Sequence, residues 1–218
     1  MRYAVISDVH GNIEALAAVL EDVRERGIRE VLFLGDAVGY GPDPGACIEL
    51  LHASCAASIA GNHDWAVLGL TDPRRFNDAA LQAIVWTRDR LNETHAALLA
   101  RYPLALPVLS HDCFLVHGTP HEPDQWHYLM SLHDAGHNFN AFDKKICMVG
   151  HTHQPFIIER LPSGELVTYR QEACIGDLER YIINAGSVGQ PRDGDPRACY
   201  LEVSDDVARI RRISYDIG

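Results

Sequence analysis

Acidic, amide and imidazole side chains recur in five short segments, each directly after an apolar run. Such groups supply the oxygen and nitrogen donors that proteins use to bind divalent metal ions. One shared metal site would allow metal-assisted hydrolysis, in which the ions polarise a substrate and activate water. In chain order the segments are Asp8-Val9-His10, Gly35-Asp36, Gly61-Asn62-His63-Asp64, His117-Gly118 and Gly150-His151-Thr152-His153.

The number of donors exceeds what one tetrahedral zinc needs, because a catalytic zinc uses three protein ligands. Divided between two ions with one shared carboxylate, the count fits, and ions roughly 3.5–4 Å apart can clamp a phosphoryl group. Two divalent ions carry +4, and Asp8 with Asp36 carries −2, so the site would be about +2 in a chain of net charge −11. A small phosphorylated substrate would be attracted there, whereas long nucleic acid would be repelled by the acidic surface.

Apolar strands must position these segments. Runs at 3–7, 31–34, 57–60, 112–117 and 145–150 are short and rich in β-branched residues, and each precedes one segment. The carboxyl ends of strands form the ligand-binding edge of an open α/β sheet, so segments up to 145 positions apart can meet. Asp8 and His10 are two apart and should point to the same side, as should His151 and His153. Asn62 and His63 are neighbours and should diverge.

The remaining pattern predicts an α/β fold. Helical spacing occurs at 12–26 and 43–53, and 76–101 should hold two helices. A strand-rich half follows, and without a flexible linker we expect one domain over 1–218 with two sheets face to face and helices outside. Its further strands are predicted at 104–109, 155–161, 165–170, 180–183, 197–203 and 207–214, with hairpin turns at Pro162-Ser163-Gly164 and Ser204-Asp205-Asp206.

Two other features have ordinary explanations. The stretch from His121 to His137 is rich in histidine and is predicted to be a solvated loop, although Trp126, His127 and Tyr128 could form a flap that selects substrate. Glu202 is interpreted as an ordinary edge residue. Arg209, Arg211 and Arg212 are interpreted as a solvated strand face.

The five motifs together carry a family resemblance. The order D-x-H, G-D, G-N-H-D, a lone His before Gly, and G-H-T-H resembles the calcineurin-like metallophosphoesterase superfamily over about two-thirds of the chain. Gly39-Tyr40-Gly41-Pro42 and the segment 186–192 resemble a compact bacterial branch without an appended domain, except that Ala185 stands where Pro is expected. The resemblance implies a four-layer α/β/β/α sandwich of two mixed β-sheets flanked by helices.

The resemblance also implies roles for individual residues. His63 would protonate the leaving oxygen or stabilise the transition state, and Asp64 would hold His63 through its other ring nitrogen. Tyr40 and Arg192 are weaker candidates for substrate binding, since a guanidinium can grip phosphate. A metal-bridging hydroxide would attack phosphorus in line. Asp8, His10 and His153 would hold one ion and Asn62, His117 and His151 the other, with Asp36 bridging.

The metal and the substrate stay open at this stage. Mn²⁺ is preferred because oxygen ligands are well represented and no Cys participates, while Fe, Zn, Co and Ni also suit the donor set. A phosphomonoester, phosphodiester, cyclic nucleotide or dinucleoside polyphosphate would fit a two-metal clamp. With no room for a capping domain, we expect a shallow, open cleft that accepts diesters at least as well as monoesters.

Composition excludes several classes of protein. With 47% hydrophobic and 22% charged residues the chain is typical of a globular protein, and no run could span a membrane. Six scattered Cys without C-x-x-C predict idle thiols in a cytoplasmic protein. Two alternatives to a phosphoesterase are a protein-binding scaffold that retains the fold without catalysis, and a peptide or amide hydrolase, which the absence of H-E-x-x-H disfavours. Oligomeric state is not predicted.

Overall fold

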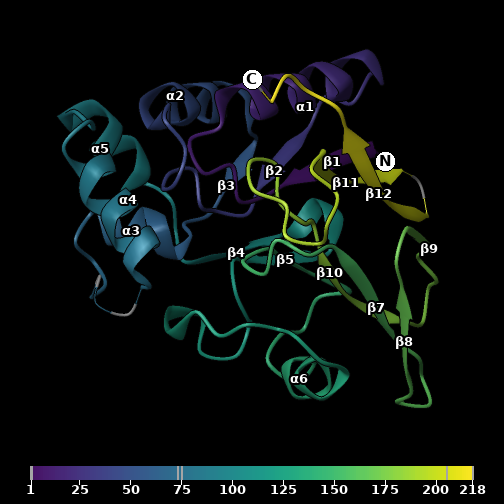
Figure 1. The fold of residues 1–218 in the computed structure, drawn as a ribbon. Helices are drawn as coiled ribbons and strands as arrows, with labels where there is room; N and C mark the ends of the chain where they lie inside the picture. The colour runs from purple at the N-terminus through teal and green to yellow at the C-terminus, as the bar shows by residue number, and fades with distance from the viewer. Residues whose placement is uncertain (1, 73, 75, 205, 218) are drawn as a thin grey trace.

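The computed structural model describes residues 2–72, 74, 76–204 and 206–217, which form four layers (Figure 1). Two six-stranded sheets lie face to face between helices. The first sheet has the order β3 (Ala57–Ser58), β2 (Val31–Phe33), β1 (Arg2–Ile6), β11 (Ala198–Ser204), β12 (Val207–Ile213) and β9 (Glu172–Cys174). The second has the order β4 (Ala105–Val108), β5 (Cys113–Val116), β6 (Ile146–Val149), β10 (Arg180–Asn184), β7 (Phe156–Arg160) and β8 (Leu166–Tyr169).

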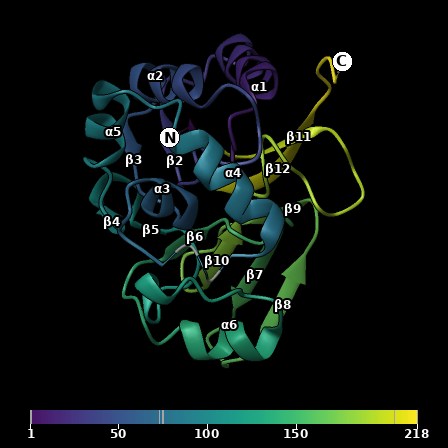
Figure 2. The ribbon, with the colours of Figure 1, turned by 60° about the vertical axis from the view of Figure 1, so that its left-hand side comes forward.

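Both sheets are mixed. Strand β1 runs parallel to β2 and antiparallel to β11, and β10 runs parallel to β6 and antiparallel to β7. Helices cover the outer faces, with α1 and α2 on the first sheet and α6 on the second (Figure 2). The predicted four-layer α/β/β/α sandwich of two mixed sheets is therefore confirmed.

Four of the described helices, α1, α4, α5 and α6, begin where asparagine or serine side chains cap them. Asn12, Asn77 and Asn92 each accept a hydrogen bond from a backbone N–H of the first turn, which satisfies a donor that has no partner within the helix. The two helices predicted within 76–101 are confirmed as α4 and α5. The six helices of the described residues are α1 (Ile13–Glu25), α2 (Pro44–Ser54), α3 (Asn62–Val67), α4 (Asp78–Arg88), α5 (Glu93–Leu99) and α6 (Leu132–Asn138).

Alternation along the strands divides the core between the layers. In β1, Val5 is buried between the two sheets, whereas Ala4 and Ile6 pack toward α1 and α2. In β6, Met148 faces the first sheet and Val149 packs in the cluster around α6. Both central strands are thus apolar on both faces, and their carboxyl ends are held rigidly.

The structure departs from the predicted elements in several places. Helix α6 and a 3₁₀ turn at Pro123–Gln125 occupy the stretch predicted as a loop, and β9 was not predicted. Strand β3 is shorter than expected. Helix α6 forms because Ser131 caps it and Ala135 is buried, but its many polar residues hide the helical period. The predicted turn Ser204-Asp205-Asp206 includes Asp205, which lies outside the described residues.

Among the residues that the structure describes, no helix is long and apolar enough to cross a bilayer.

Candidate metal centre

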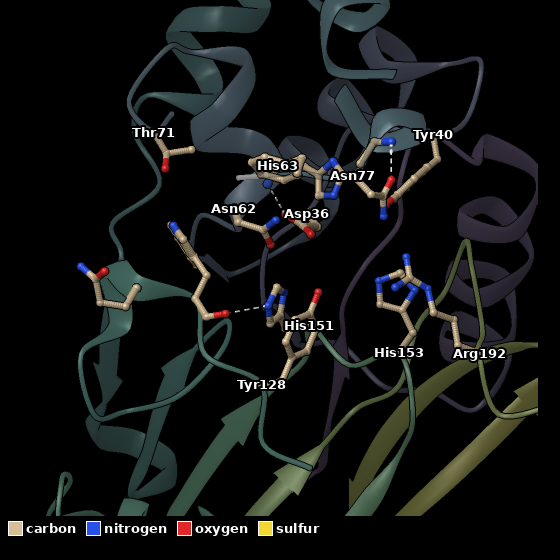
Figure 3. Close-up of a pocket in the computed structure, with 14 residues that line it drawn as sticks. Asp36, Tyr40, Asn62, His63, Thr71, Asn77, Tyr128, His151, His153 and Arg192 are labelled. Atoms are coloured by element: carbon tan, nitrogen blue, oxygen red, sulfur yellow. Dashed lines mark hydrogen bonds between the residues drawn. The ribbon is translucent and has the colours of Figure 1, made fainter. Parts of the chain in front are cut away.

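The five polar segments converge at the carboxyl ends of strands. Figure 3 shows members of three of them, Asp36, Asn62 with His63, and His151 with His153. Asp36 Oδ2 lies 3.2 Å from His117 Nε2 and 3.7 Å from His10 Nε2, although these residues come from three different segments. The site is almost closed to solvent, because no predicted ligand is more than 7% exposed. The candidates that the structure brings together are Asp8, His10, Asp36, Asn62, His117, His151 and His153.

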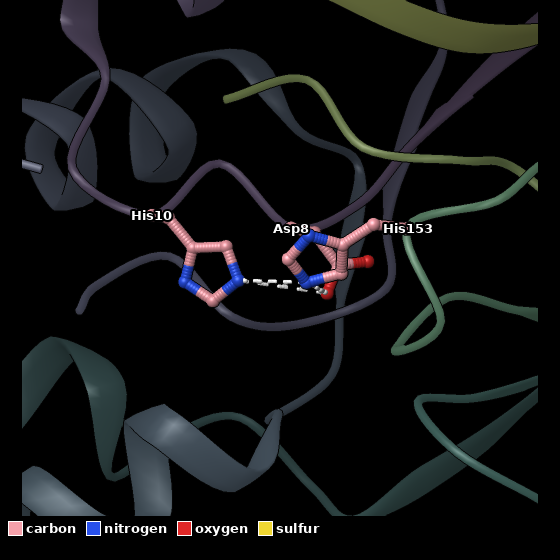
Figure 4. Close-up of side chains that lie close together, drawn as sticks. All are labelled: Asp8, His10 and His153. Atoms are coloured by element: carbon pink, nitrogen blue, oxygen red, sulfur yellow. Dashed lines mark hydrogen bonds and ion pairs between the residues drawn. The ribbon is translucent and has the colours of Figure 1, made fainter. Parts of the chain in front are cut away.

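Asp8, His10 and His153 form the first cluster, and their side chains point toward one another (Figure 4). His10 Nε2 lies 3.1 Å from His153 Nε2, and Asp8 Oδ1 lies 3.2 Å from His153 Nε2. Ligands roughly 2.1 Å from one ion, at angles between octahedral and tetrahedral, are about 3.0–3.4 Å apart. The spacing therefore suits three ligands of one ion.

Hydrogen bonds on the far side of these rings decide which nitrogen faces inward. His10 Nδ1 lies 2.9 Å from the carbonyl oxygen of Val38, and His153 Nδ1 lies 2.6 Å from that of Gln190. A carbonyl oxygen only accepts, so each Nδ1 carries a hydrogen, and in a neutral ring Nε2 then presents a lone pair. Two lone pairs facing each other repel, and a cation between them removes the repulsion.

Asp36, His117 and His151 form the second cluster, with one donor atom of each within 4.8 Å of the others. His117 Nδ1 donates to the carbonyl oxygen of Leu34 at 2.7 Å, so its Nε2 faces the centre. His151 has the opposite arrangement, because its Nε2 donates to the carbonyl oxygen of Trp126 at 2.9 Å. His151 therefore offers Nδ1, and both rings are oriented as metal ligands usually are.

Several buried polar atoms at the centre have no hydrogen-bond partner. They include Asp8 Oδ1, Asn62 Oδ1 and His117 Nε2. Buried polar atoms without partners are costly and rare in folded proteins. These three are metal-ligand types that face one site, so the residues present fit two divalent ions, one at each cluster.

The backbone at the centre adopts a left-handed conformation that L-residues rarely use. The φ angles are 54° at Asp8, 52° at His10, 59° at Asp36, 66° at His151 and 58° at His153. Asp8 and His10 point into the same cluster, as predicted. The cause is a tight turn rather than a strand, because β1 already ends at Ile6. Such strain concentrates at functional sites.

Close approach of two strand ends requires glycine at two positions. A Cβ on Gly61 would overlap the Asp36 carboxylate, and a Cβ on Gly150 would overlap the Ser7 hydroxyl. Any larger residue at either position would push the segments apart.

The charges at the centre are those of a metal-binding site. Burial would favour the neutral acid at Asp36, but the neighbouring His117 and His63 rings outweigh it and hold its pKa well below the ordinary value. Burial opposes a charge on His117, yet Asp36 and Asp8 raise its pKa to about 9. Burial lowers the pKa of His10 to about 3 and that of His151 to about 3. Ionised carboxylates attract cations, and His117 would give up its proton when a metal ion binds, because a ligating imidazole must be neutral.

His63 lies beside the two clusters and belongs to neither of them. Helix α3 starts at Asn62, so Asn62 and His63 occupy its first turn. Both side chains line the same cavity, so they do not diverge to opposite sides as predicted. The His63 ring contacts the Tyr40 ring at 4.9 Å and the Phe76 ring at 5.0 Å between centroids, and its Nδ1 has no hydrogen-bond partner. Burial lowers the pKa of His63. A third possible donor grouping joins it to His10 and Asp36.

Asp64 does not hold the His63 ring, and this prediction is wrong. Its carboxylate accepts hydrogen bonds from the backbone N–H groups of Asp36, Ala37 and Gly61, each at 2.9 Å. As the third residue of α3 it turns back to the helix start and the adjacent loop, where free N–H groups are available. Burial and the Asp36 charge raise the pKa of Asp64 to about 7. Asp64 therefore fixes the loop that carries Asp36.

A cavity of about 250 Å³ opens over the centre. Tyr128 stacks on His151 with ring centroids 4.1 Å apart, and Trp126 lines the same cavity, so the stretch predicted as a solvated loop contributes a wall. Aromatic side chains therefore line part of the cavity over the centre, and the shallow, open cleft stays a prediction. Sequence reasoning missed Thr71, Phe76, Asn77, Ala80 and Gln125, which line this cavity and belong to no motif.

Tyr40 and Arg192, the predicted substrate-binding residues, also line the cavity (Figure 3). The Arg192 guanidinium carbon lies 5.7 Å from the centre of the Tyr40 ring, and the same guanidinium donates to Gln190 Oε1. A fixed cation therefore stands at the edge of the cavity.

Comparison with known proteins gives the family. A family model described as the calcineurin-like phosphoesterase superfamily domain matches residues 1–206. The chain belongs to this superfamily. An uncharacterized protein of Methanocaldococcus jannaschii is 38% identical over 98% of this chain and 88% of its own length. Phosphodiesterase YfcE of Escherichia coli is 24% identical over 96% of this chain and 91% of its own.

Solved structures agree with the family assignment. A crystal structure of a metallophosphoesterase from Sphaerobacter thermophilus is 39% identical, covers 100% of this chain and 89% of its own, and superposes with a TM-score of 0.85. A protein of Pyrococcus horikoshii described as hypothetical shows the same fold at 20% identity and a TM-score of 0.78, with 99% of this chain and 89% of its own covered.

Proposed function

We propose that this phosphoesterase hydrolyses small phosphate esters with two divalent metal ions. The observation that carries the proposal is the pair of buried donor clusters, whose unpartnered atoms face one another around Asp36. The family and the relative named phosphodiesterase support the same reaction class. Asp8, His10 and His153 would hold one ion, Asn62, His117 and His151 the other, and Asp36 would contact both.

Two bound ions would supply Lewis-acid polarisation of the phosphoryl oxygens and a water of lowered pKa. The chain itself orients the imidazole ligands. Carbonyl oxygens of Val38, Leu34 and Gln190 accept from the outer ring nitrogens, so that the other nitrogen of each ring faces the centre. Asp64 holds the Asp36 loop by three backbone hydrogen bonds. The Asp36 carboxylate would thereby be kept in place without reorganisation during turnover.

His63 would assist the leaving group. Its ring lines the cavity next to the centre. Because Nδ1 is buried beside Gly39, Nε2 is the ring nitrogen that would reach a substrate oxygen. A proton held on a ring nitrogen would pass to the ester oxygen as the bond to phosphorus breaks. Tyr40, whose ring contacts that of His63, and Arg192 would contact the phosphate or its substituent.

We further propose that the substrate is a diester at least as readily as a monoester, because the clusters and His63 require only one phosphorus with its leaving oxygen. Mn²⁺ is the preferred ion, since carboxylate and amide oxygens stand beside the imidazoles and all six cysteines lie outside the site. Residues 1–218 would act as one domain, supported by the buried cluster that both sheets share. A cytoplasmic location stays a prediction.

A metal-reconstitution assay tests the proposal. Protein stripped by chelation is reloaded with Mn²⁺, Fe²⁺, Zn²⁺, Co²⁺ or Ni²⁺, and turnover is measured on bis-p-nitrophenyl phosphate, p-nitrophenyl phosphate and a p-nitroanilide. We expect two ions per chain and metal-dependent cleavage of the phosphate esters only. Two bound ions without turnover of any phosphate ester would favour the scaffold, and cleavage of the anilide would favour an amide hydrolase.

A further inference from the structure

A second group of histidines lies around helix α6, outside the metal centre. His121, His127, His133 and His137 line one surface hollow of about 360 Å³, together with Asp134. These four histidines are called the α6 histidine cluster below. Its members come from the helix and from the segment before it, which pack together.

Helical geometry places two members on one face. His133 and His137 are four residues apart within α6, so their side chains are neighbours on its surface. A His pair with this spacing on a helix is an effective chelate for zinc and similar ions. Both side chains are exposed and can rotate without moving the backbone.

The third member is held against the helix by its backbone. The His121 N–H donates to Oδ1 of buried Asn138 at 3.1 Å, and its carbonyl accepts from the Thr119 hydroxyl at 2.9 Å. The His121 ring meets the His137 ring with centroids 4.6 Å apart. His121 is thereby fixed beside the helical pair.

The surrounding charges favour a cation. Glu122 Oε2 lies 3.4 Å from His127 Nε2 and 3.7 Å from His121 Nε2, and the Asp134 carboxylate lies on the same hollow. Imidazole ligands with two nearby carboxylates attract a divalent ion and disfavour an anion. Among the described residues, groups of three ligand atoms within 4.8 Å of one another occur at the buried centre and not in the α6 histidine cluster. Binding at the cluster therefore requires side-chain rotation.

We propose that the α6 histidine cluster binds one borderline transition-metal ion, such as Ni²⁺ or Zn²⁺, separately from the metal centre. Imidazole-rich sites suit these ions better than Mn²⁺, whereas the centre offers more oxygen ligands. His133 and His137 provide the chelating pair, and His121 or His127 completes the site. The proposal does not depend on the proposed catalytic function.

Binding would also restrain the cavity wall. His127 stands between Trp126, whose carbonyl accepts from His151, and Tyr128, which stacks on His151. An ion that joins His127 or His121 to α6 would tie this wall to the helix. Amide exchange across residues 121–131 should then slow.

The test compares Ni²⁺ uptake by wild type, by the double variant His133→Ala/His137→Ala and by the control His52→Ala, which removes an exposed histidine of α2. Each protein is loaded with Mn²⁺, equilibrated with Ni²⁺ by dialysis and analysed for both metals. Wild type and His52→Ala should retain one more Ni²⁺ per chain than the double variant, and only they should show slower exchange at 121–131. Equal Ni²⁺ uptake by all three proteins overturns the proposal.

Two further variants separate this result from other causes. His121→Ala leaves α6 intact and should weaken Ni²⁺ binding, so a folding defect of the double variant cannot decide the outcome alone. Asp36→Ala disables the centre and should keep the additional Ni²⁺. Loss of that ion in Asp36→Ala would assign it to the centre and overturn the proposal, whereas inactive wild type that keeps the ion would count only against the catalytic function.

Discussion

Two buried carboxylates in this chain are kept ionised by different neighbours. Glu202 and Asp36 are each 1% exposed. Glu202 is surrounded by permanent cations, because its Oε1 accepts from Arg2 Nε and Nη2 at 3.0 and 2.7 Å and its Oε2 accepts from Arg211 Nε at 2.6 Å. We call these three residues the Glu202 cluster. Asp36 faces two imidazoles, that of His10, whose pKa burial lowers, and that of His117, whose pKa Asp36 itself raises.

The difference shows how a structural ion pair is distinguished from a candidate metal site. In the Glu202 cluster every carboxylate oxygen has a protein donor, so burial, which would raise the Glu202 pKa, is outweighed by Arg2 and Arg211 and the pKa is lowered. At the centre, Asp8 Oδ1 and His117 Nε2 have no hydrogen-bond partner. The first site is complete within the chain, whereas the second needs a cation from outside.

The largest effect is expected for Asp36→Ala. Removing the carboxylate that faces both clusters should lower the metal content and reduce turnover by roughly 10³-fold or more, since metal electrostatics contribute several kcal/mol to such reactions. Elemental analysis and assay of bis-p-nitrophenyl phosphate hydrolysis measure both. The matched control is Asp89→Ala, an exposed carboxylate at the end of α4. Full metal content in Asp36→Ala would contradict the view that the Asp36 carboxylate, unlike that of Glu202, serves to bind metal.

His63→Ala tests the chemistry apart from metal binding. We expect both ions to remain while turnover falls roughly 10²–10⁴-fold, the usual contribution of general acid–base catalysis. The fall should be smaller for nitrophenyl esters than for alkyl esters, because nitrophenolate leaves without a proton. Metal content that falls in parallel with turnover would make His63 a ligand.

Glu202→Gln should affect stability and leave the centre alone. The change leaves Arg2 and Arg211 without their counter-charge and should lower the free energy of unfolding by about 1–3 kcal/mol. Urea denaturation of the metal-free protein measures it, and metal content and turnover should equal wild type. A loss of metal would show that the Glu202 cluster supports the centre after all.

The same variant should lose part of the acid sensitivity of folding. The folded pKa of Glu202 is lowered, so its contribution is fully present above the unfolded value of about 4.3 and is lost as pH falls through the folded pKa. The stability difference between wild type and Glu202→Gln should therefore shrink as pH falls below about 4.3. A constant difference from pH 7 to pH 3 would contradict the assigned ion pair.

The sequence predicted which polar side chains lie together, because five short motifs follow strong apolar strands whose ends must meet. It failed where a contact depends on three-dimensional packing. The hydrogen bonds of Asp64 go to loop backbone that no spacing reveals, and Glu202, interpreted as an edge residue, is buried between Arg2 and Arg211. Phe76 joins the cavity only through the position of the segment before α4.

The smallest effect is expected for Arg192→Ala, which removes a cation that is already engaged by Gln190 at the cavity edge. Unlike Arg2 and Arg211, Arg192 pairs with a neutral amide, so its charge is available to a substrate. We expect KM for phosphate esters to rise about tenfold, the equivalent of 1.4 kcal/mol, with kcat and metal content unchanged. Arg192→Lys should restore part of the affinity, because it keeps the charge and loses the bidentate geometry. Steady-state kinetics on a diester and a monoester measure the change. If KM were unaffected for both substrates, Arg192 would be a structural residue of the cavity rim, and the contrast between paired and available arginines would not hold.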